Sequence, residues 1–144
     1  MANLSSLTSL TLYDCNLQGE FPPNIFLLPR IQSIDLSYNP KLVGFLPKFQ
    51  SRSSLKKLRL PNTNFSGELP GSISNLKSLN YLDLFYTKIS GELPNSINNL
   101  KFLNYLDLSS SNFSRTIPHL LETYHSLLIF PSHITISMVN FHLY

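Results

Sequence analysis

The sequence is poor in charged residues. Asp, Glu, Lys and Arg make up only 13% of its 144 residues, about half of the ~25% that is typical of globular domains. The formal net charge of +3 is too small for the dense basic surface that nucleic acids require, so no nucleic-acid partner is expected. Ser, Asn and Thr supply most of the polarity.

Cysteine is scarcer still. The single Cys15 excludes an internal disulfide and a zinc site of the CxxC kind. The four His residues follow one another at intervals of 6, 8 and 9 positions, which match no metal motif. The chain also lacks a Gly-rich phosphate loop and a Gly-x-Ser-x-Gly elbow. We therefore expect no catalytic residue, no metal and no cofactor, and a protein that is not an enzyme.

Long apolar runs are missing as well. No stretch reaches the ~18 apolar residues that would indicate a membrane span. The first twelve residues alternate Leu with Ser and Thr, without the basic start and apolar core of a signal peptide. The sequence alone thus predicts no membrane contact by this segment.

What the sequence does contain is a repeat with a constant 24-residue period. Its first core position is always Leu or Ile, at Leu10, Ile34, Leu58, Leu82 and Leu106. Each of these is followed two residues later by Leu and preceded three residues earlier by Leu or Ile. Six residues earlier the residue is again Leu, with Arg52 as the only exception. Such a register is the signature of a stacked repeat protein.

A second block completes each unit. It reads Gly-Glu-Phe-Pro at 19–22, Gly-Phe-Leu-Pro at 44–47, Gly-Glu-Leu-Pro at 67–70 and 91–94, and Arg-Thr-Ile-Pro at 115–118. The second unit gains one residue before Gly44 and loses one before Leu58, so the period is kept. Short helical or 3₁₀ turns are expected around Ile25, Ile73 and Ile97, after these prolines.

Together the two blocks resemble the plant-specific class of leucine-rich repeat, LxxLxxLxLxxNxLxGxIPxx. Pieces such as Asn-Phe-Ser-Gly-Glu-Leu-Pro and Leu-Asp-Leu-Ser are similar to the ectodomains of plant receptor-like proteins. The resemblance implies an α/β repeat fold, a leucine-rich repeat solenoid with a parallel β-sheet on the concave face and short 3₁₀ or helical turns on the convex side. We expect five such repeats over residues 1–118, and a degenerate partial repeat or non-repeat tail over residues 119–144 that adds one strand within 133–144.

In a strand, neighbouring residues point to opposite faces, so the residues beside the core leucines should line the concave face. Arg59 falls between Asp35 and Asp83, which predicts ion pairs across adjacent strands. Asp83 and Asp107 are close enough in register to raise each other's pKa. Exposed aromatics beside Arg and Asp have the composition of binding hot spots, although the rings could instead merely stack on one another. The candidate ligand-binding residues are Tyr38, Arg59, Tyr81, Asp83, Phe85, Tyr86, Tyr105 and Asp107.

Three sequons for N-glycosylation begin at Asn3, Asn64 and Asn112. The last two occupy the same position of their repeats. Five residues after each first core position the family usually has Asn, and here the residues are Cys15, Asn39, Thr63, Thr87 and Ser111. All are small and able to bond to the backbone of the following loop, so a structural role is expected for Cys15.

The resemblance implies a plasma-membrane receptor-like protein whose extracellular repeats bind a protein or peptide ligand, with a co-receptor as a further partner, in defence or development. Because the chain starts inside a repeat and lacks the paired-cysteine amino-terminal cap of the family, we expect a fragment of a longer protein. The alternatives are a secreted enzyme inhibitor like the polygalacturonase-inhibiting proteins, and an intracellular scaffold or a pseudogene product.

Overall fold

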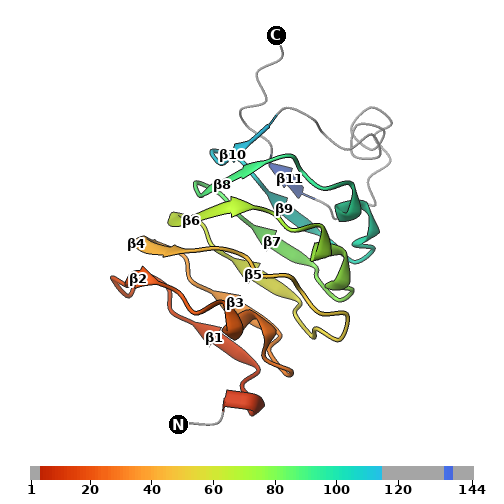
Figure 1. The fold of residues 1–144 in the computed structure, drawn as a ribbon, viewed down its shortest axis with the longest axis horizontal. Helices are drawn as coiled ribbons and strands as arrows, with labels where there is room; N and C mark the ends of the chain where they lie inside the picture. Colours follow the sequence, from red (N-terminus) through yellow and green to blue (C-terminus); the bar gives the residue numbers. More distant parts are fainter. Residues whose placement is uncertain (1–3, 115–134, 138–144) are drawn as a thin grey trace.

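The computed structural model describes residues 4–114 and 135–137, and it shows two parallel β-sheets stacked face to face (Figure 1). The first sheet has the strand order β1-β3-β5-β7-β9-β11, and the second the order β10-β8-β6-β4-β2. The first sheet consists of β1 (Ser9–Thr11), β3 (Ser33–Asp35), β5 (Lys57–Arg59), β7 (Tyr81–Asp83), β9 (Tyr105–Asp107) and β11 (Thr135–Ser137). The second sheet consists of β2 (Gln18–Glu20), β4 (Asn39–Gly44), β6 (Thr63–Glu68), β8 (Lys88–Gly91) and β10 (Asn112–Phe113).

The predicted register is confirmed. From β1 to β9, each strand of the first sheet pairs with the equivalent strand of the next unit, so that Leu10 faces Ile34 and Leu58 faces Leu82. Each unit buries its leucines only against its neighbours, as in other solenoids. The four central units have fully or nearly fully buried core residues, namely Ile34, Leu36, Leu58, Leu60, Leu82, Leu84, Leu106 and Leu108.

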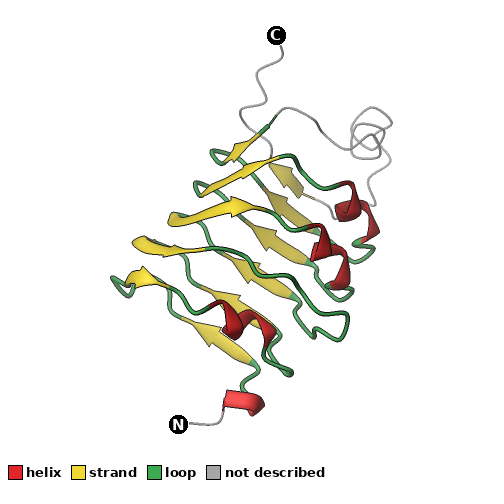
Figure 2. Ribbon diagram, in the orientation of Figure 1, coloured by secondary structure: helices red, strands yellow, loops and turns green. Residues whose placement is uncertain are grey.

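The predicted 3₁₀ turns are also confirmed. η2 (Pro23–Leu27), η3 (Gly71–Asn75) and η4 (Asn95–Asn99) lie on one side of the molecule, beyond the strands (Figure 2), and η1 (Leu4–Ser6) precedes β1. Each of η2, η3 and η4 follows a proline in extended conformation, Pro22, Pro70 or Pro94. Because proline fixes φ near −65° and has no N–H, it suits the start of such a turn.

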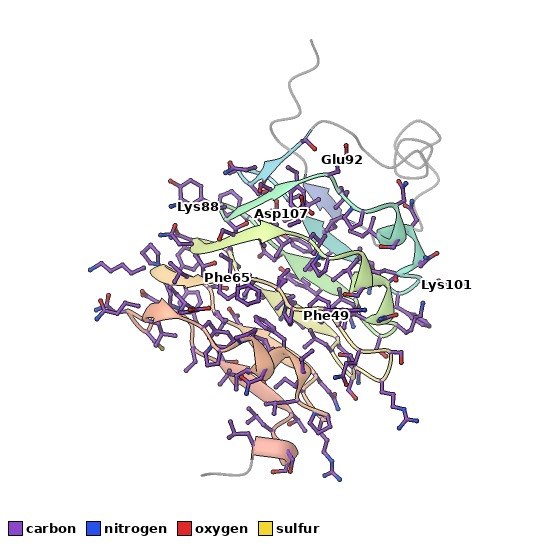
Figure 3. The ribbon with its side chains drawn as sticks, viewed as in Figure 1. Phe49, Phe65, Lys88, Glu92, Lys101 and Asp107 are labelled. Carbon is purple, nitrogen blue, oxygen red and sulfur yellow. The ribbon has the colours of Figure 1, made fainter. Side chains whose placement is uncertain are left out.

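The second sheet was not predicted from the sequence. Its strands contain Gly and exposed polar residues, and β2 is exposed throughout, so no alternating pattern marks them. Between the two sheets lie aromatic rings: Phe26 and Phe65 are 6.0 Å apart with their planes at 87°. Figure 3 shows Phe65 within this interior. The edge-to-face arrangement is one that aromatic pairs favour.

The insertion expected in the second unit appears as an irregularity of strand pairing. β4 pairs with β6 through Asn39 and Thr63, and then shifts register so that Gly44 faces Phe65. Gly19, Gly67 and Gly91 lie in strands of the second sheet with φ near +83°, a backbone conformation that glycine adopts at little steric cost. Gly44 differs, because its role is to leave room for Phe65: a Cβ on Gly44 would lie 2.8 Å from that ring.

A strand within 133–144 was expected, and β11 confirms it. It pairs with β9, with Ile136 opposite Leu106. The sixth place in the first sheet is therefore taken by residues 135–137, which lie further along the chain than the repeat period would place them. The other residues of 119–144, and with them the four histidines, lie outside the described residues.

Candidate functional site

The outward-facing residues of the first sheet form two rows. The first residues of β5, β7 and β9 are Lys57, Tyr81 and Tyr105, which pair directly in register. The third residues of β3, β5, β7 and β9 are Asp35, Arg59, Asp83 and Asp107. We use the name open face for these two rows together with Tyr38, Phe85 and Tyr86, which lie in the turns after the strands.

The first row is a stack of a cation and two rings. Tyr81 and Tyr105 lie with their ring centroids 4.1 Å apart and their planes at 4° to each other. Lys57 Nζ is 5.0 Å from the centroid of Tyr81, and Arg59 Cζ is 5.8 Å from it. Both distances lie within the ~6 Å over which a ring attracts a cation. The alternative that the aromatic residues stack on one another is thus correct for this pair.

The second row places one arginine between two carboxylates. Arg59 Nη1 is 2.9 Å from Asp35 Oδ2, and Arg59 Nε is 3.7 Å from Asp83 Oδ2. The ion pairs predicted from the register are therefore present. The contact with Asp83 is too long for a hydrogen bond, and the buried Arg59 Nε has no hydrogen-bond partner.

The three aspartates are less exposed than expected from their outward register. Asp35, Asp83 and Asp107 each have at most 9% of their surface exposed. One carboxylate oxygen of each is used by the chain two residues further on: Ser109 donates to Asp107 Oδ1 from its N–H at 2.9 Å and from its Oγ at 2.6 Å. The corresponding bonds link Ser37 to Asp35 and the Phe85 N–H to Asp83. A ligand can reach only what remains of each carboxylate.

The pKa of Asp83 is raised above its ordinary value. The largest cause is burial, which disfavours the charged form; the neighbouring Asp107 adds to it, while the Phe85 N–H and Arg59 act in the opposite direction. The predicted influence of Asp107 is thus present, but it is secondary to burial. The pKa of the Tyr105 phenol is also raised, by burial first and then by Asp83 and Asp107. Tyr105 donates a 3.3 Å hydrogen bond to Asp107 Oδ2.

The other predicted aromatic residues lie in the turns after the strands and form separate groups. Tyr38 packs against Tyr13, at a centroid distance of 5.3 Å, and Phe85 lies 6.1 Å from Tyr86. Tyr86 is 61% exposed and is the most accessible of the predicted site residues. The eight residues therefore do not converge on one point but line the open face in three groups.

Some side chains of these turns do not face outward. Ser37, Pro61 and Ser109, each of which directly follows the second core leucine of its repeat, are buried. The residues at positions 38, 62, 86 and 110, which follow these positions in their repeats, have a positive φ of 52° to 60°. Such a conformation is unusual for Tyr, and here it turns the chain toward the second sheet.

Lys57 is the residue missing from the predicted site, although it stands one repeat before Tyr81 and pairs with it.

A hollow of about 410 Å³ lies beside Tyr86, between the turns and the second sheet. Its lining includes Asn62, Lys88 and the two sequon residues Asn64 and Asn112. Asn112 is exposed and Asn64 is half-buried. Asn3, the third sequon residue, lies outside the described residues.

The described residues contain neither a candidate metal site nor a candidate membrane-spanning helix. Within 4–114 and 135–137, no group of three or more His, Cys, Asp or Glu side chains is placed to hold a metal ion. In the same part of the chain, no helix has the length and hydropathy needed to cross a membrane.

Proteins with sequences similar to this chain include plant receptor-like proteins. Receptor-like protein 6 of Arabidopsis thaliana is 54% identical over 74 residues, which are 51% of this chain and 7% of that protein. Receptor-like protein Cf-9 of Solanum pimpinellifolium is 40% identical over 81 residues, or 54% of this chain and 9% of that protein. This chain thus spans about a tenth or less of the length of these relatives.

Solved structures show the same fold. The LRR ectodomain of the receptor kinase SOBIR1 from Arabidopsis thaliana has a TM-score of 0.72 and 31% identity, covering 91% of this chain and 68% of that one. The Arabidopsis receptor kinase HAESA, solved in complex with the peptide hormone IDA and the co-receptor SERK1, has a TM-score of 0.76 and 34% identity, covering 94% of this chain and 22% of that one.

The Leucine Rich Repeat family matches four segments of the sequence, residues 6–28, 54–76, 78–100 and 102–123. The irregular second unit lies between the first two of these segments, and its strands β3 and β4 take their places in the two sheets. Since the matched segments make up more than half of the chain, this protein belongs to the leucine-rich repeat family, and it is similar to segments of the plant receptor-like proteins.

Proposed function

We propose that this chain is a partner-recognition segment of a plant receptor-like protein, and that its open face binds a protein or peptide ligand. The observation that carries the proposal is the row of Lys57, Tyr81 and Tyr105 beside Arg59 on the outward side of the first sheet. Rings held flat by stacking, next to a cation, offer contact area with little loss of side-chain freedom. In this proposal the segment recognises a partner and does not catalyse a reaction.

We propose further that this segment lies on the extracellular side of the plasma membrane, in a protein that acts in defence or developmental signalling. The similarity to receptor-like proteins and to a receptor kinase solved with a peptide hormone and a co-receptor supports it. A co-receptor is accordingly the second partner that we propose for the full-length protein.

Glycosylation belongs to the same proposal. Asn112 is exposed and Asn64 half-buried, so Asn112 is the better acceptor of the two. After expression in a plant secretory system, removal of N-glycans should lower the mass of the wild-type chain, and the shift should shrink in Asn112→Gln. An equal shift in the two proteins would contradict the assignment of Asn112.

A display experiment tests the binding face. A random dodecapeptide library is selected on the wild-type chain, and the recovered clones are measured on the double variant Tyr81→Ala with Tyr86→Ala. Binding should weaken at least tenfold, since aromatic anchors carry much of an interface's free energy. Phe102→Ala is the matched control, because Phe102 is 66% exposed but lies in the turn before β9.

The result that would overturn the proposal is equally clear. If the double variant keeps its circular dichroism spectrum and melting temperature but binds every selected clone as the wild type does, the open face is not the binding face. The inhibitor alternative predicts something different, namely that the wild-type chain slows a polygalacturonase.

A further inference from the structure

The second repeat departs from the others on the side that carries the 3₁₀ turns. Where the other units place Ile25, Ile73 and Ile97, it has Phe49, and where they place Leu28, Leu76 and Leu100, it has Arg52. Phe49 is 1% exposed and fills the interior at the isoleucine position. Figure 3 shows Phe49 on this side of the molecule. Arg52 is exposed, so the second unit exchanges a core leucine for a surface cation.

This unit also lacks a 3₁₀ turn. In Figure 2 the turns η2 and η3 are separated by a loop, which contains residues 48–53. The loop is held on one side by η3: the Phe49 N–H donates to Ser72 Oγ at 2.9 Å, and Asn75 Nδ2 donates to the Phe49 carbonyl at 2.9 Å. On the other side the Ser54 Oγ donates to the Pro29 carbonyl at 3.3 Å. The loop therefore has a defined shape.

Two hollows open on this loop. One, of about 160 Å³, lies between the loop and the end of η2, and the other, of about 470 Å³, is formed by residues 48–52. Gln50 and Arg52 line both. The smaller hollow has Phe26, Leu27, Leu28 and Pro29 on its other wall, so it is apolar on one side and carries a cation on the other. We call the two hollows together the notch.

The charged residues that line the notch, Lys48 and Arg52, are both cations. They belong to a stretch of sequence, residues 36–67, that contains six of the eleven basic residues of the chain and none of its eight acidic ones. Within the described residues, Arg59 makes all the ion pairs that are found, to Asp35 and Asp83. Lys48 and Arg52, which line the notch, have no carboxylate partner there.

We propose that the notch binds a short acidic segment of a partner protein, with a carboxylate at Arg52 and Lys48 and a neighbouring apolar side chain in the smaller hollow. Arg presents a planar fork of donors that matches a carboxylate, and charge-assisted hydrogen bonds of this kind are among the strong ones. A volume of about 160 Å³ suits one apolar side chain. The notch lies apart from the open face, so this second contact is independent of the proposed ligand site.

The apolar wall is what separates this partner from a simple polyanion. A nucleic acid would be held by the cations alone and would have no use for the apolar surface of Leu27 and Leu28, which are only half-buried. In a segment of alternating Glu and Leu or Phe, the carboxylates can pair with the cations while the apolar side chains contact the apolar wall. The test is therefore built to vary the charge and the apolar side chains of the probe separately.

The experiment measures fluorescence anisotropy of a labelled peptide, Gly-Glu-Leu-Glu-Phe-Glu-Gly, with the full 144-residue chain. Two matched peptides replace either every Glu by Gln or both Leu and Phe by Ser. Each replacement should weaken binding about tenfold or more. Arg52→Leu should weaken the parent peptide at least tenfold while the melting temperature stays equal or rises, because the variant restores the leucine of the other repeats. Arg52→Gln gives a second variant that adds no apolar surface.

Lys101→Leu is the control, since Lys101 is an exposed cation in the turn after η4 and should leave binding within twofold of the wild type. The proposal is overturned if Arg52→Leu and Arg52→Gln bind the peptide as the wild type does. It is also overturned if the Ser-substituted peptide binds as tightly as the parent, which would mean that the cations alone act. Absence of binding up to about 1 mM rejects it outright.

Discussion

The rings of Tyr81 and Tyr105 stack 4.1 Å apart and almost parallel, although they belong to different repeats. The repeat length brings them together, because it places the two residues directly opposite each other on β7 and β9. Tyr81 has Lys57 and Arg59 near its ring as well. The ring of Tyr81 thus links the first and second rows of the open face.

This stack should contribute to stability beyond the area it covers. Aromatic pairs are worth about 0.5–1.5 kcal/mol in double-mutant cycles, so Tyr81→Leu and Tyr105→Leu should show a coupling of about that size in urea unfolding. Leu keeps an apolar side chain in the sheet but removes the ring together with its hydroxyl, so the Tyr105 bond to Asp107 is lost as well; the double-mutant cycle separates that single-site loss from the coupling of the two rings. Strictly additive effects of the two substitutions would contradict the packing described for this pair.

Arg59 is expected to matter more than an ordinary surface cation. Its removal in Arg59→Met leaves Asp35 and Asp83 without their common counter-charge, and both are nearly buried. An unpaired buried group costs about 1–3 kcal/mol, so the free energy of unfolding at pH 7 should fall by about that amount. Lys48→Met, which removes a cation without a described ion pair, should change it by less than about 0.5 kcal/mol.

The same variant should respond to pH in a defined direction. Protonation of Asp83 removes a charge that Arg59 offsets, so the stability lost in Arg59→Met should shrink as the pH falls through the raised pKa of Asp83. An equal loss at pH 7 and pH 3 would show that packing of the arginine side chain, and not its charge, is what matters.

Asp83 itself should lower stability when it is ionised. Its pKa is raised in the folded chain above the unfolded value of 3.8, mainly by burial. A group of this kind favours the folded state at pH values below its unfolded pKa, and this contribution is lost as the pH rises through the folded pKa. The stability of the wild type relative to Asp83→Asn should therefore decrease as the pH is raised from below 3.8 through the raised pKa. Asn keeps the oxygen that accepts from Phe85 N–H.

The fixed repeat length determines which residues of neighbouring strands lie opposite each other, and this part of the open face could be predicted from the sequence. The period places Arg59 opposite Asp35 and Asp83 whatever the side chains do, so the ion pairs were predictable. It does not determine side-chain geometry, so the stack of Tyr81 on Tyr105 appeared only as an alternative. Lys57 was left out of the predicted site because its role depends on the ring beside it.

The burial of the aspartates shows a second limit. Asp35 and Asp107 are each followed two residues later by Ser, which turns back and donates to the carboxylate. Asp commonly makes such local bonds at turns, so the recurring Asp-Leu-Ser indicated that these carboxylates would be partly buried. The alternation of side chains along a strand predicts only that they point outward. The second sheet was hidden for another reason: its strands depend on pairing with neighbouring units more than on any pattern of their own.

Asn39 is predicted to be the most sensitive polar residue of the described chain. It is fully buried, and its side chain joins two units: Oδ1 accepts from the N–H groups of Cys15 and Leu17, while Nδ2 donates to the carbonyls of Leu12, Leu36 and Ser37. Asn39→Ala should cost about 3 kcal/mol or more, because several buried backbone groups lose their partner together.

Thr63 occupies the same position of the next unit and gives a matched comparison. Its hydroxyl donates a single 2.7 Å bond to the carbonyl of Leu60, so Thr63→Ala should cost only about 1 kcal/mol. Urea unfolding of the two variants decides the matter, and equal losses would show that the bonds between units at Asn39 do not contribute as described.

Gly44 should tolerate no larger residue. A Cβ at this position would lie 2.8 Å and 2.9 Å from two atoms of the Phe65 ring, and that ring is fully buried against Phe21 and Phe26. Because the ring cannot move into open space, Gly44→Ala should lower the free energy of unfolding by about 1–3 kcal/mol, the usual effect of overpacking. In Gly71→Ala the nearest atom to the new Cβ is Ser96 Oγ, 4.0 Å away, so this control should be neutral or slightly stabilising. If Gly44→Ala melts at the wild-type temperature, Phe65 has room to shift, and the interior between the two sheets is looser than the contacts of its aromatic rings indicate.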